Sequence, residues 1–131
     1  TDEIQSSVFI CYDLRFPEIF RVVAKDVLII YVIGNWPASR QHHWHTLLRA
    51  RAVENLCYVV GVNRTGEDGE GIRYAGGSAV YSPSGEEVLL ADDKEEIFYA
   101  DINPEYALKL RSDYGFLNDI KWIPQARPGA I

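Results

Sequence analysis

The length, composition and charge of this chain predict one globular domain and exclude several functional classes. With 131 residues, of which 47% are hydrophobic, the chain is long enough to bury a core. Thirteen basic against nineteen acidic residues give a net charge of −6, which argues against nucleic acid or an anionic membrane as a partner. No apolar run approaches the ~20 residues of a membrane span, so we expect a cytoplasmic protein.

Apolar runs alternate with helix signals over the first part of the chain. Residues 8–10 predict a short buried strand, residues 13–16 a turn, and Pro17 the first position of a helix that continues over residues 18–25. The continuous apolar run 27–33 is typical of a strand covered on both faces. These elements are the beginning of a β-α-β pattern.

The second half of the chain predicts one long helix and then mostly strands. Helix formers fill residues 40–56, and residues 58–63 predict the next strand. The remaining elements follow in chain order as a surface loop over 64–71, strands over 78–82, 87–91 and 95–102, and a helix from 103 or 104 to 113. This succession predicts an α/β layered fold.

Cys11 lies where the first predicted strand ends and the first helix is about to begin. The free N–H groups and partial positive charge of a helix start can stabilise a thiolate there. The alternative is a small inert core residue, the usual role of a cysteine at the end of a buried strand. Cys57, which has no polar motif after it, is predicted to be core packing. Two such cysteines do not make a disulfide framework.

The residues around Cys11 favour the reactive alternative. The sequence Cys-Tyr-Asp-Leu-Arg-Phe-Pro-Glu at 11–18 resembles the cysteine signature of the nitrilase, or carbon-nitrogen hydrolase, superfamily. Further matching segments follow in the expected order at 34–38, 49–55, 58–64, 74–78 and 82–86. The resemblance therefore extends from about residue 6 to about residue 115.

Within the superfamily, the chain most resembles the omega-amidase branch. The residues that carry this likeness are Asn-Trp-Pro-Ala at 35–38, His-Trp at 43–44, Thr-Leu-Leu at 46–48 and Ala-Arg-Ala at 50–52. The resemblance implies hydrolysis of small dicarboxylic monoamides such as 2-oxoglutaramate and 2-oxosuccinamate. Open alternatives are a nitrile, N-carbamoyl or acylamide substrate, or a catalytically incomplete interaction module.

The resemblance also implies that this chain is about half of a four-layer αββα sandwich. Residues 1–115 would be the C-terminal part of the hydrolase domain, and residues 116–131 an arm that packs on another subunit. We therefore expect a homodimer or a higher homo-oligomer. Thr1 at the start and the absence of methionine lead us to expect an internal fragment of a longer protein.

The superfamily uses a Glu-Lys-Cys triad, of which only the cysteine is found here. Ten residues precede Cys11 and include no lysine, so the general base and the lysine are expected from a missing N-terminal half. Cys11 would attack the amide carbon, and the Tyr12 backbone N–H would help to stabilise the oxyanion. Ammonia would leave from a thioester, and no cofactor is required.

Three further residues near Cys11 are candidates for the site. Arg15 could face a substrate carboxylate, or it could pair with Asp13 or Glu18 and stabilise the turn. Asn35 and Trp36 follow a parallel-type strand at its carboxyl end, where α/β proteins place ligands, so they are expected to line the pocket.

Two clusters of charged or ionisable residues have a catalytic or metal-binding interpretation that we do not favour. Arg51 and Glu54 have the i,i+3 spacing of a helical ion pair that would fix the helix near Cys11, although a catalytic carboxylate is the alternative. His42, His43 and His45 invite a metal or a Cys-His dyad, but their spacing suits neither. We therefore expect no metal.

Overall fold

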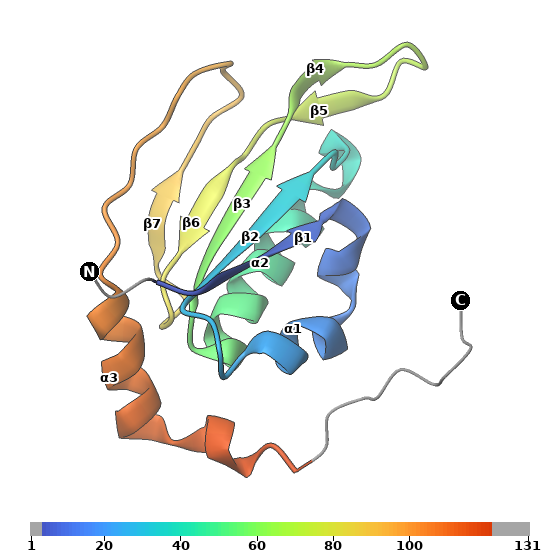
Figure 1. The fold of residues 1–131 in the computed structure, drawn as a ribbon. Helices are drawn as coiled ribbons and strands as arrows, with labels where there is room; N and C mark the ends of the chain where they lie inside the picture. The colour runs from blue at the N-terminus through green and yellow to red at the C-terminus, as the bar shows by residue number, and fades with distance from the viewer. Residues whose placement is uncertain (1–3, 122–131) are drawn as a thin grey trace.

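The computed structural model describes residues 4–121, and its central feature is a five-stranded mixed sheet (Figure 1). The strand order is β1-β2-β3-β6-β7. The strands are β1 (Ser6–Ile10), β2 (Ile29–Gly34), β3 (Tyr58–Asn63), β6 (Ala79–Tyr81) and β7 (Glu87–Leu90). The first three are parallel, while β6 is antiparallel to β3 and β7 to β6. The predicted α/β fold is confirmed.

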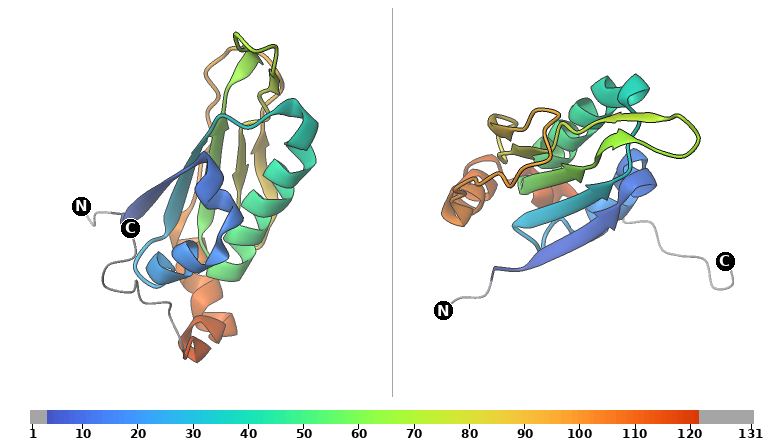
Figure 2. Two further views of the ribbon diagram at one scale, coloured as in Figure 1. Left: turned by 90° about the vertical axis from the view of Figure 1, so that its right-hand side faces the viewer. Right: turned by 90° about the horizontal axis from the view of Figure 1, so that it is seen from above.

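Two helices lie over one face of the sheet, and each connects neighbouring parallel strands (Figures 1 and 2). Helix α1 (Pro17–Val23) begins with its proline, whose missing N–H would have no partner in the helix anyway. Helix α2 (Gln41–Asn55) ends at Leu56, where a left-handed φ of 47° turns the chain toward β3. Both connections are the crossovers that parallel strands require.

Close packing of α2 on the sheet forms the main core. The buried side chains that meet there include Phe20, Ile30, Val32, Trp44, Leu48 and Val59. A Cβ atom at Gly61 would lie 2.3 Å from Leu48 Cδ1, so only glycine lets β3 approach the helix this closely. Burial of these apolar side chains is the principal favourable term in folding.

A third helix, α3 (Pro104–Tyr114), lies beside the end of the sheet where β2 and β3 begin (Figure 1). The Asn103 side chain caps it by accepting a hydrogen bond of 3.0 Å from the Glu105 N–H. Arg111 donates to the backbone carbonyl groups of Leu56 and Val27 at 2.9 and 2.6 Å. These bonds attach α3 to the loops that lead into β3 and β2.

The opposite face of the parallel strands exposes apolar side chains in two cross-strand rows. One row is Val8, Tyr31 and Val60, and the other is Ile10, Ile33 and Val62. Ile10 is 64% exposed and Ile33 is 53% exposed. We call these six residues the open face. The strand over 27–33 was predicted to be covered on both faces, which is wrong within residues 4–121, where only one face carries helices.

Two predicted elements after β3 differ from the structure. The segment 64–71 is not wholly a loop, because β4 (Thr65–Glu67) pairs with β5 (Arg73–Ala75) in a hairpin. The Asp68 carboxylate supports this hairpin by accepting from the N–H groups of Glu70 and Ile72, at 3.0 Å each. The strand predicted over 95–102 does not form, because this extended segment has no ladder partner among the described residues.

The predicted arm over 116–131 lies largely outside the described residues. Its first part forms a short 3₁₀ helix (Phe116–Asp119), and Leu117 packs with Ala24, Leu56 and Leu110. A domain boundary after residue 115 and subunit contacts by the arm therefore stay predictions. Within residues 4–121 no helix has the length and apolar character needed to cross a membrane.

Candidate active site around Cys11

Cys11 occupies a strained turn directly after β1. It is the first residue of a 3₁₀ helix (Cys11–Arg15), and its φ of 42° lies in the left-handed region that favours glycine. A non-glycine residue held there costs about 1–3 kcal/mol, and such strain clusters at functional sites. The Asp13 carboxylate fixes the turn by accepting from the Ile10 N–H at 2.9 Å. The prediction that Cys11 lies at a strand-to-helix junction is confirmed.

A buried arginine on α2, Arg51, contacts this turn. Arg51 on α2 is 4% exposed, and its Nη2 donates to the Leu14 carbonyl oxygen at 2.7 Å. Its Nη1 meets Glu54 Oε1 at 3.0 Å, so the predicted i,i+3 ion pair is present. A donor from Arg21 reaches the Glu54 backbone carbonyl oxygen as well. Arg51 thus connects α2 to the segment that carries Cys11.

A cavity of about 330 Å³ opens at Cys11. It is lined by Cys11, Tyr12, Arg15, Asn35, Trp36, Pro37 and Arg40. All five residues predicted to act on or bind substrate therefore lie around one space, whereas Asp13, Arg51 and Glu54 lie outside its lining. The two loops that line the cavity follow β1 and β2. The carboxyl ends of these strands are adjacent because the strands are parallel neighbours in the sheet. The sequence reasoning missed Arg40.

Asn63, at the end of β3, holds the second lining loop in place. Its side chain accepts from the Trp36 N–H at 2.8 Å and donates to the Trp36 carbonyl oxygen at 3.1 Å. The Trp36 indole N–H in turn donates to the Arg40 carbonyl oxygen at 2.9 Å. Sequence reasoning also missed Asn63, although its place at the carboxyl end of a predicted parallel strand was a usable signal.

Arg15 makes neither of the ion pairs considered for it. Its guanidinium carbon lies 4.7 Å from the centre of the Trp36 ring, a cation–π arrangement. Within residues 4–121 no carboxylate oxygen lies within 4.0 Å of its nitrogens, and the Asp13 carboxylate is instead engaged by Ile10. The turn-stabilising alternative is therefore wrong, and Arg15 is left to face the cavity.

The β4–β5 hairpin contacts Asn35, one of the residues that line the cavity. Asn35 Nδ2 donates to the Tyr74 hydroxyl at 3.4 Å, and that hydroxyl donates to Asp68 Oδ2 at 2.7 Å. The hydrogen bond from Tyr74 lowers the pKa of Asp68 and, by the same contact, raises the pKa of Tyr74. The hairpin therefore has a direct connection to the lining loop.

The two cysteines differ in the way that the sequence predicts. Cys57 is fully buried, and burial raises its pKa to about 12, so it stays a neutral thiol. Cys11 is partly exposed and lines the cavity. Neither forms a disulfide. Of the two thiols, only Cys11 has access to a small molecule.

The histidines take no part in the Cys11 site. His45 Nδ1 lies 3.1 Å from the Tyr81 hydroxyl oxygen, and none of the three histidines lines the cavity at Cys11. The Cys-His dyad considered from the sequence is therefore not formed. The described part of the chain brings together no group of three His, Cys, Asp or Glu side chains that could hold a metal ion. Among the described residues, the cavity lining also includes no carboxylate that could serve as the general base, and no lysine.

Comparison with known proteins finds a matching family model, and the names of similar proteins agree with that family. The family model described as carbon-nitrogen hydrolase matches residues 1–112. A protein of Escherichia coli K12 named omega-amidase YafV is 52% identical over 83 residues, which are 63% of this chain and 32% of that protein. A 2-oxoglutaramate amidase of Paenarthrobacter nicotinovorans is 41% identical over 110 residues, 83% of this chain and 37% of that protein.

The fold is likewise shared with solved structures of this kind. A CN-hydrolase superfamily protein from Xanthomonas campestris matches with a TM-score of 0.85 and 34% identity, over 91% of this chain and 48% of that chain. This chain thus spans about a third to a half of the length of these relatives.

Proposed function

This chain belongs to the carbon-nitrogen hydrolase family, and we propose that it carries the nucleophile of an amidase for small dicarboxylic monoamides. The observation that carries the proposal is Cys11, held in a strained turn at a cavity that also presents Arg15. The names omega-amidase and 2-oxoglutaramate amidase of its relatives support 2-oxoglutaramate and 2-oxosuccinamate as substrates.

The proposed reaction proceeds through a thioester on Cys11. A base removes the thiol proton, and the sulfur attacks the amide carbon to give a tetrahedral oxyanion. The Tyr12 backbone N–H, at the start of the 3₁₀ helix, is proposed as one donor to that oxyanion. Protonated nitrogen leaves as ammonia, and water then attacks the thioester to release the acid and restore the thiol.

Arg15 is proposed to bind the substrate carboxylate, while Asn35 and Trp36 shape the cavity around it. A guanidinium binds a carboxylate through two parallel hydrogen bonds, which fixes both its place and its direction. Trp36 already orients the guanidinium of Arg15, so little conformational freedom would be lost on binding. The scissile amide at the other end of the substrate would then lie toward the thiol.

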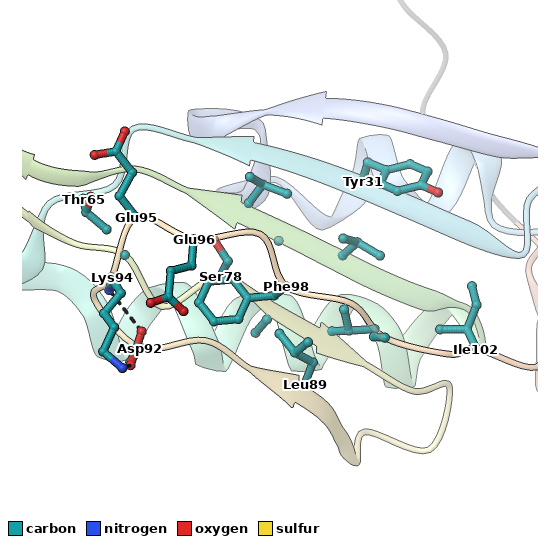
Figure 3. A pocket seen from close by; sticks show the side chains of 17 residues that line it. Tyr31, Thr65, Ser78, Leu89, Asp92, Lys94, Glu95, Glu96, Phe98 and Ile102 are labelled. Atoms are coloured by element: carbon teal, nitrogen blue, oxygen red, sulfur yellow. Dashed lines mark hydrogen bonds and ion pairs between the residues drawn. The ribbon is translucent and has the colours of Figure 1, made fainter.

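The base and the lysine are proposed to come from a second segment that covers the open face. The apolar rows on β1 to β3 continue into a cavity of about 410 Å³ between the sheet and the segment over 92–102. Tyr31, Phe98 and Ile102 lie around this cavity (Figure 3). The partner we propose is the N-terminal half of a carbon-nitrogen hydrolase domain, because the chain matches only 48% of its structural neighbour.

A second candidate function applies to the chain by itself. The described residues that line the Cys11 cavity include no base, which favours a catalytically incomplete interaction module that only binds a partner. A nitrile, N-carbamoyl or acylamide substrate would use the same thiol but would gain nothing from Arg15 when it carries no carboxylate.

Ammonia release from 2-oxoglutaramate tests the proposal. The assay compares the protein with its Cys11→Ala and Cys57→Ala variants, before and after iodoacetamide, and intact mass spectrometry identifies every polypeptide present. We expect Cys11→Ala and alkylation to abolish turnover, and Cys57→Ala to retain it. Turnover that survives Cys11→Ala would refute the nucleophile. No release by a preparation that contains both halves would refute the substrate.

A further inference from the structure

The cavity at Cys11 contains a second guanidinium that the proposed mechanism has not used. Arg40 lines it together with Arg15, and the other lining residues besides the thiol are Tyr12, Asn35, Trp36 and Pro37. None of these four residues is an aspartate, a glutamate, a histidine, a lysine or an arginine. The lining therefore presents two positive charges and no negative one.

Neither arginine is neutralised within the described residues. No carboxylate oxygen of residues 4–121 lies within 4.0 Å of the Arg40 or Arg15 nitrogens. Other arginines differ, since Arg49 pairs with Glu87 and Arg51 with Glu54. Two unpaired cations beside one thiol raise the local positive potential and attract an anion.

Trp36 is the common support of the two arginines. Its ring lies under the Arg15 guanidinium at 4.7 Å, and its indole N–H donates to the Arg40 carbonyl oxygen at 2.9 Å. Trp36 is itself 3% exposed, and Asn63 holds its backbone through two hydrogen bonds. The place of Arg40 at the cavity is therefore fixed by a buried residue, while its own side chain is exposed and free to bind.

We infer that Arg40 is a second anion-binding residue that, with Arg15, selects amides carrying a carboxylate at the end remote from the scissile bond. This inference rests on the proposed function and assigns a specificity determinant within it. A 2-oxo monoamide ends in a carboxylate next to a carbonyl group, which together offer three acceptor oxygens. One guanidinium fork engages two of them, so a second arginine gives the third a donor.

Differential alkylation of Cys11 tests the charge directly and needs no turnover. The anionic reagent iodoacetate and the neutral reagent iodoacetamide react with the same thiolate, and mass spectrometry of the Cys11 peptide in the full chain gives both rates. We expect Arg40→Gln to lower the iodoacetate-to-iodoacetamide rate ratio by about threefold or more, because it removes one of the two positive charges that line the cavity with the thiol. Arg40→Lys should keep most of the ratio.

Two controls make this measurement specific. Arg73→Gln removes a positive charge that does not line the cavity, so the ratio should stay unchanged. Raising the salt concentration should lower the ratio of the unmodified protein and leave that of Arg40→Gln less affected. An unchanged ratio in Arg40→Gln, with the circular dichroism spectrum intact, would overturn the inference.

Kinetics of the complete enzyme separate this inference from the proposed function. We expect Arg40→Gln to lower kcat/KM for 2-oxoglutaramate by about 10- to 100-fold, mainly through KM, and to leave a neutral aliphatic amide nearly unchanged. Equal losses on both amides would indicate a merely structural role and overturn the inference. Failure of the unmodified enzyme to hydrolyse 2-oxoglutaramate would refute the proposed function, whereas the alkylation ratio would still decide whether Arg40 binds anions.

Discussion

Arg51 shows how one buried residue can determine the geometry of a reactive one. It contacts the Leu14 carbonyl oxygen with one donor and the Glu54 carboxylate with another, and its guanidinium lies 5.2 Å from the centre of the Phe20 ring. A buried cation must keep such partners, because an unpaired buried charge is strongly destabilising. The sequence spacing predicted the pair with Glu54, but the contact with Leu14 depends on how α2 packs.

The Glu54→Gln variant distinguishes a structural carboxylate from a catalytic one. We expect it to lower the free energy of unfolding by about 1–2 kcal/mol, a moderate value because Glu54 is 30% exposed and partly screened by water. Ammonia release per folded molecule should change little. Urea unfolding and the ammonia assay measure the two effects, with Glu70→Gln as an exposed control. Loss of activity at unchanged stability would make Glu54 catalytic.

The stability of the folded chain is expected to depend on pH through His45. Burial lowers its pKa from 6.5, Glu87 raises it and Arg49 lowers it further. The His45 imidazole therefore binds a proton more tightly in the unfolded chain than in the folded one. Its contribution to the free energy of unfolding is fully present above about pH 6.5 and decreases as the pH falls toward the lower pKa of the folded state.

Urea midpoints at a series of pH values below and above 6.5 measure this effect. We expect His45→Gln to flatten the decrease and the exposed His43→Gln to leave it in place. A decrease of the same size in both variants would assign the pH dependence to other groups.

Sequence reasoning located most of the Cys11 site and missed the residues that act through geometry. Cys11, Arg15, Asn35 and Trp36 lie in short segments that resemble a family signature, so they could be named without coordinates. Asn63 also lies in a matching segment, at the end of a strand, and Arg40 lies just before a helix, but neither residue type by itself indicates a role in the site. Their roles arise only when β2 and β3 become neighbours, which brings Asn63 to Trp36.

Among the secondary-structure elements, the periodicity of apolar residues predicted the bounds of α2 and β3 closely but wrongly predicted a strand over 95–102. β3 has the predicted bounds, and α2 differs by one residue at each end, because their apolar faces are set by burial against each other. The segment over 95–102 has a strand-like composition, yet Ile97 is 79% exposed and no strand pairs with it. Strand formation depends on a partner that local sequence does not specify.

The contact between α2 and β3 leads to a prediction for Gly61. A Cβ atom there would meet Leu48 Cδ1 at 2.3 Å and Trp44 Cζ2 at 2.9 Å, so Gly61→Ala forces core side chains to move. We expect a loss of about 1–3 kcal/mol in the free energy of unfolding. Gly69→Ala is the matched control, because no atom lies within 4 Å of its added Cβ. Equal stability of the two variants would contradict this packing.

At the scale of the whole molecule, the open face is the feature that most needs a partner. Its six side chains form a continuous apolar surface on a sheet whose other face is already covered by helices (Figure 2). Exposed apolar surfaces of this kind mark interaction sites or promote aggregation. Binding of the proposed N-terminal half would cover this surface, whereas self-association through the arm over 116–131 stays a separate prediction.

The Ile33→Lys variant tests whether the open face binds a partner. We expect the unmodified chain by itself to bind another polypeptide or to self-associate, and Ile33→Lys to reduce this association and abolish activity with the N-terminal half. Size-exclusion chromatography with intact mass measurement gives the result. Ile97→Lys, on the segment beside the face, should keep the activity. A stable, monodisperse 14.9 kDa monomer of the unmodified chain would contradict a required partner.

Direct detection of a thioester would show whether Cys11 is the nucleophile of an amidase. The complete enzyme is mixed with 2-oxoglutaramate, quenched in acid during turnover, digested and analysed by mass spectrometry. We expect an acyl adduct on the Cys11 peptide that disappears as substrate is exhausted and that is absent from the Cys57 peptide. Steady release of ammonia with an unmodified Cys11 peptide, and with undiminished rate in Cys11→Ala, would contradict this role of Cys11.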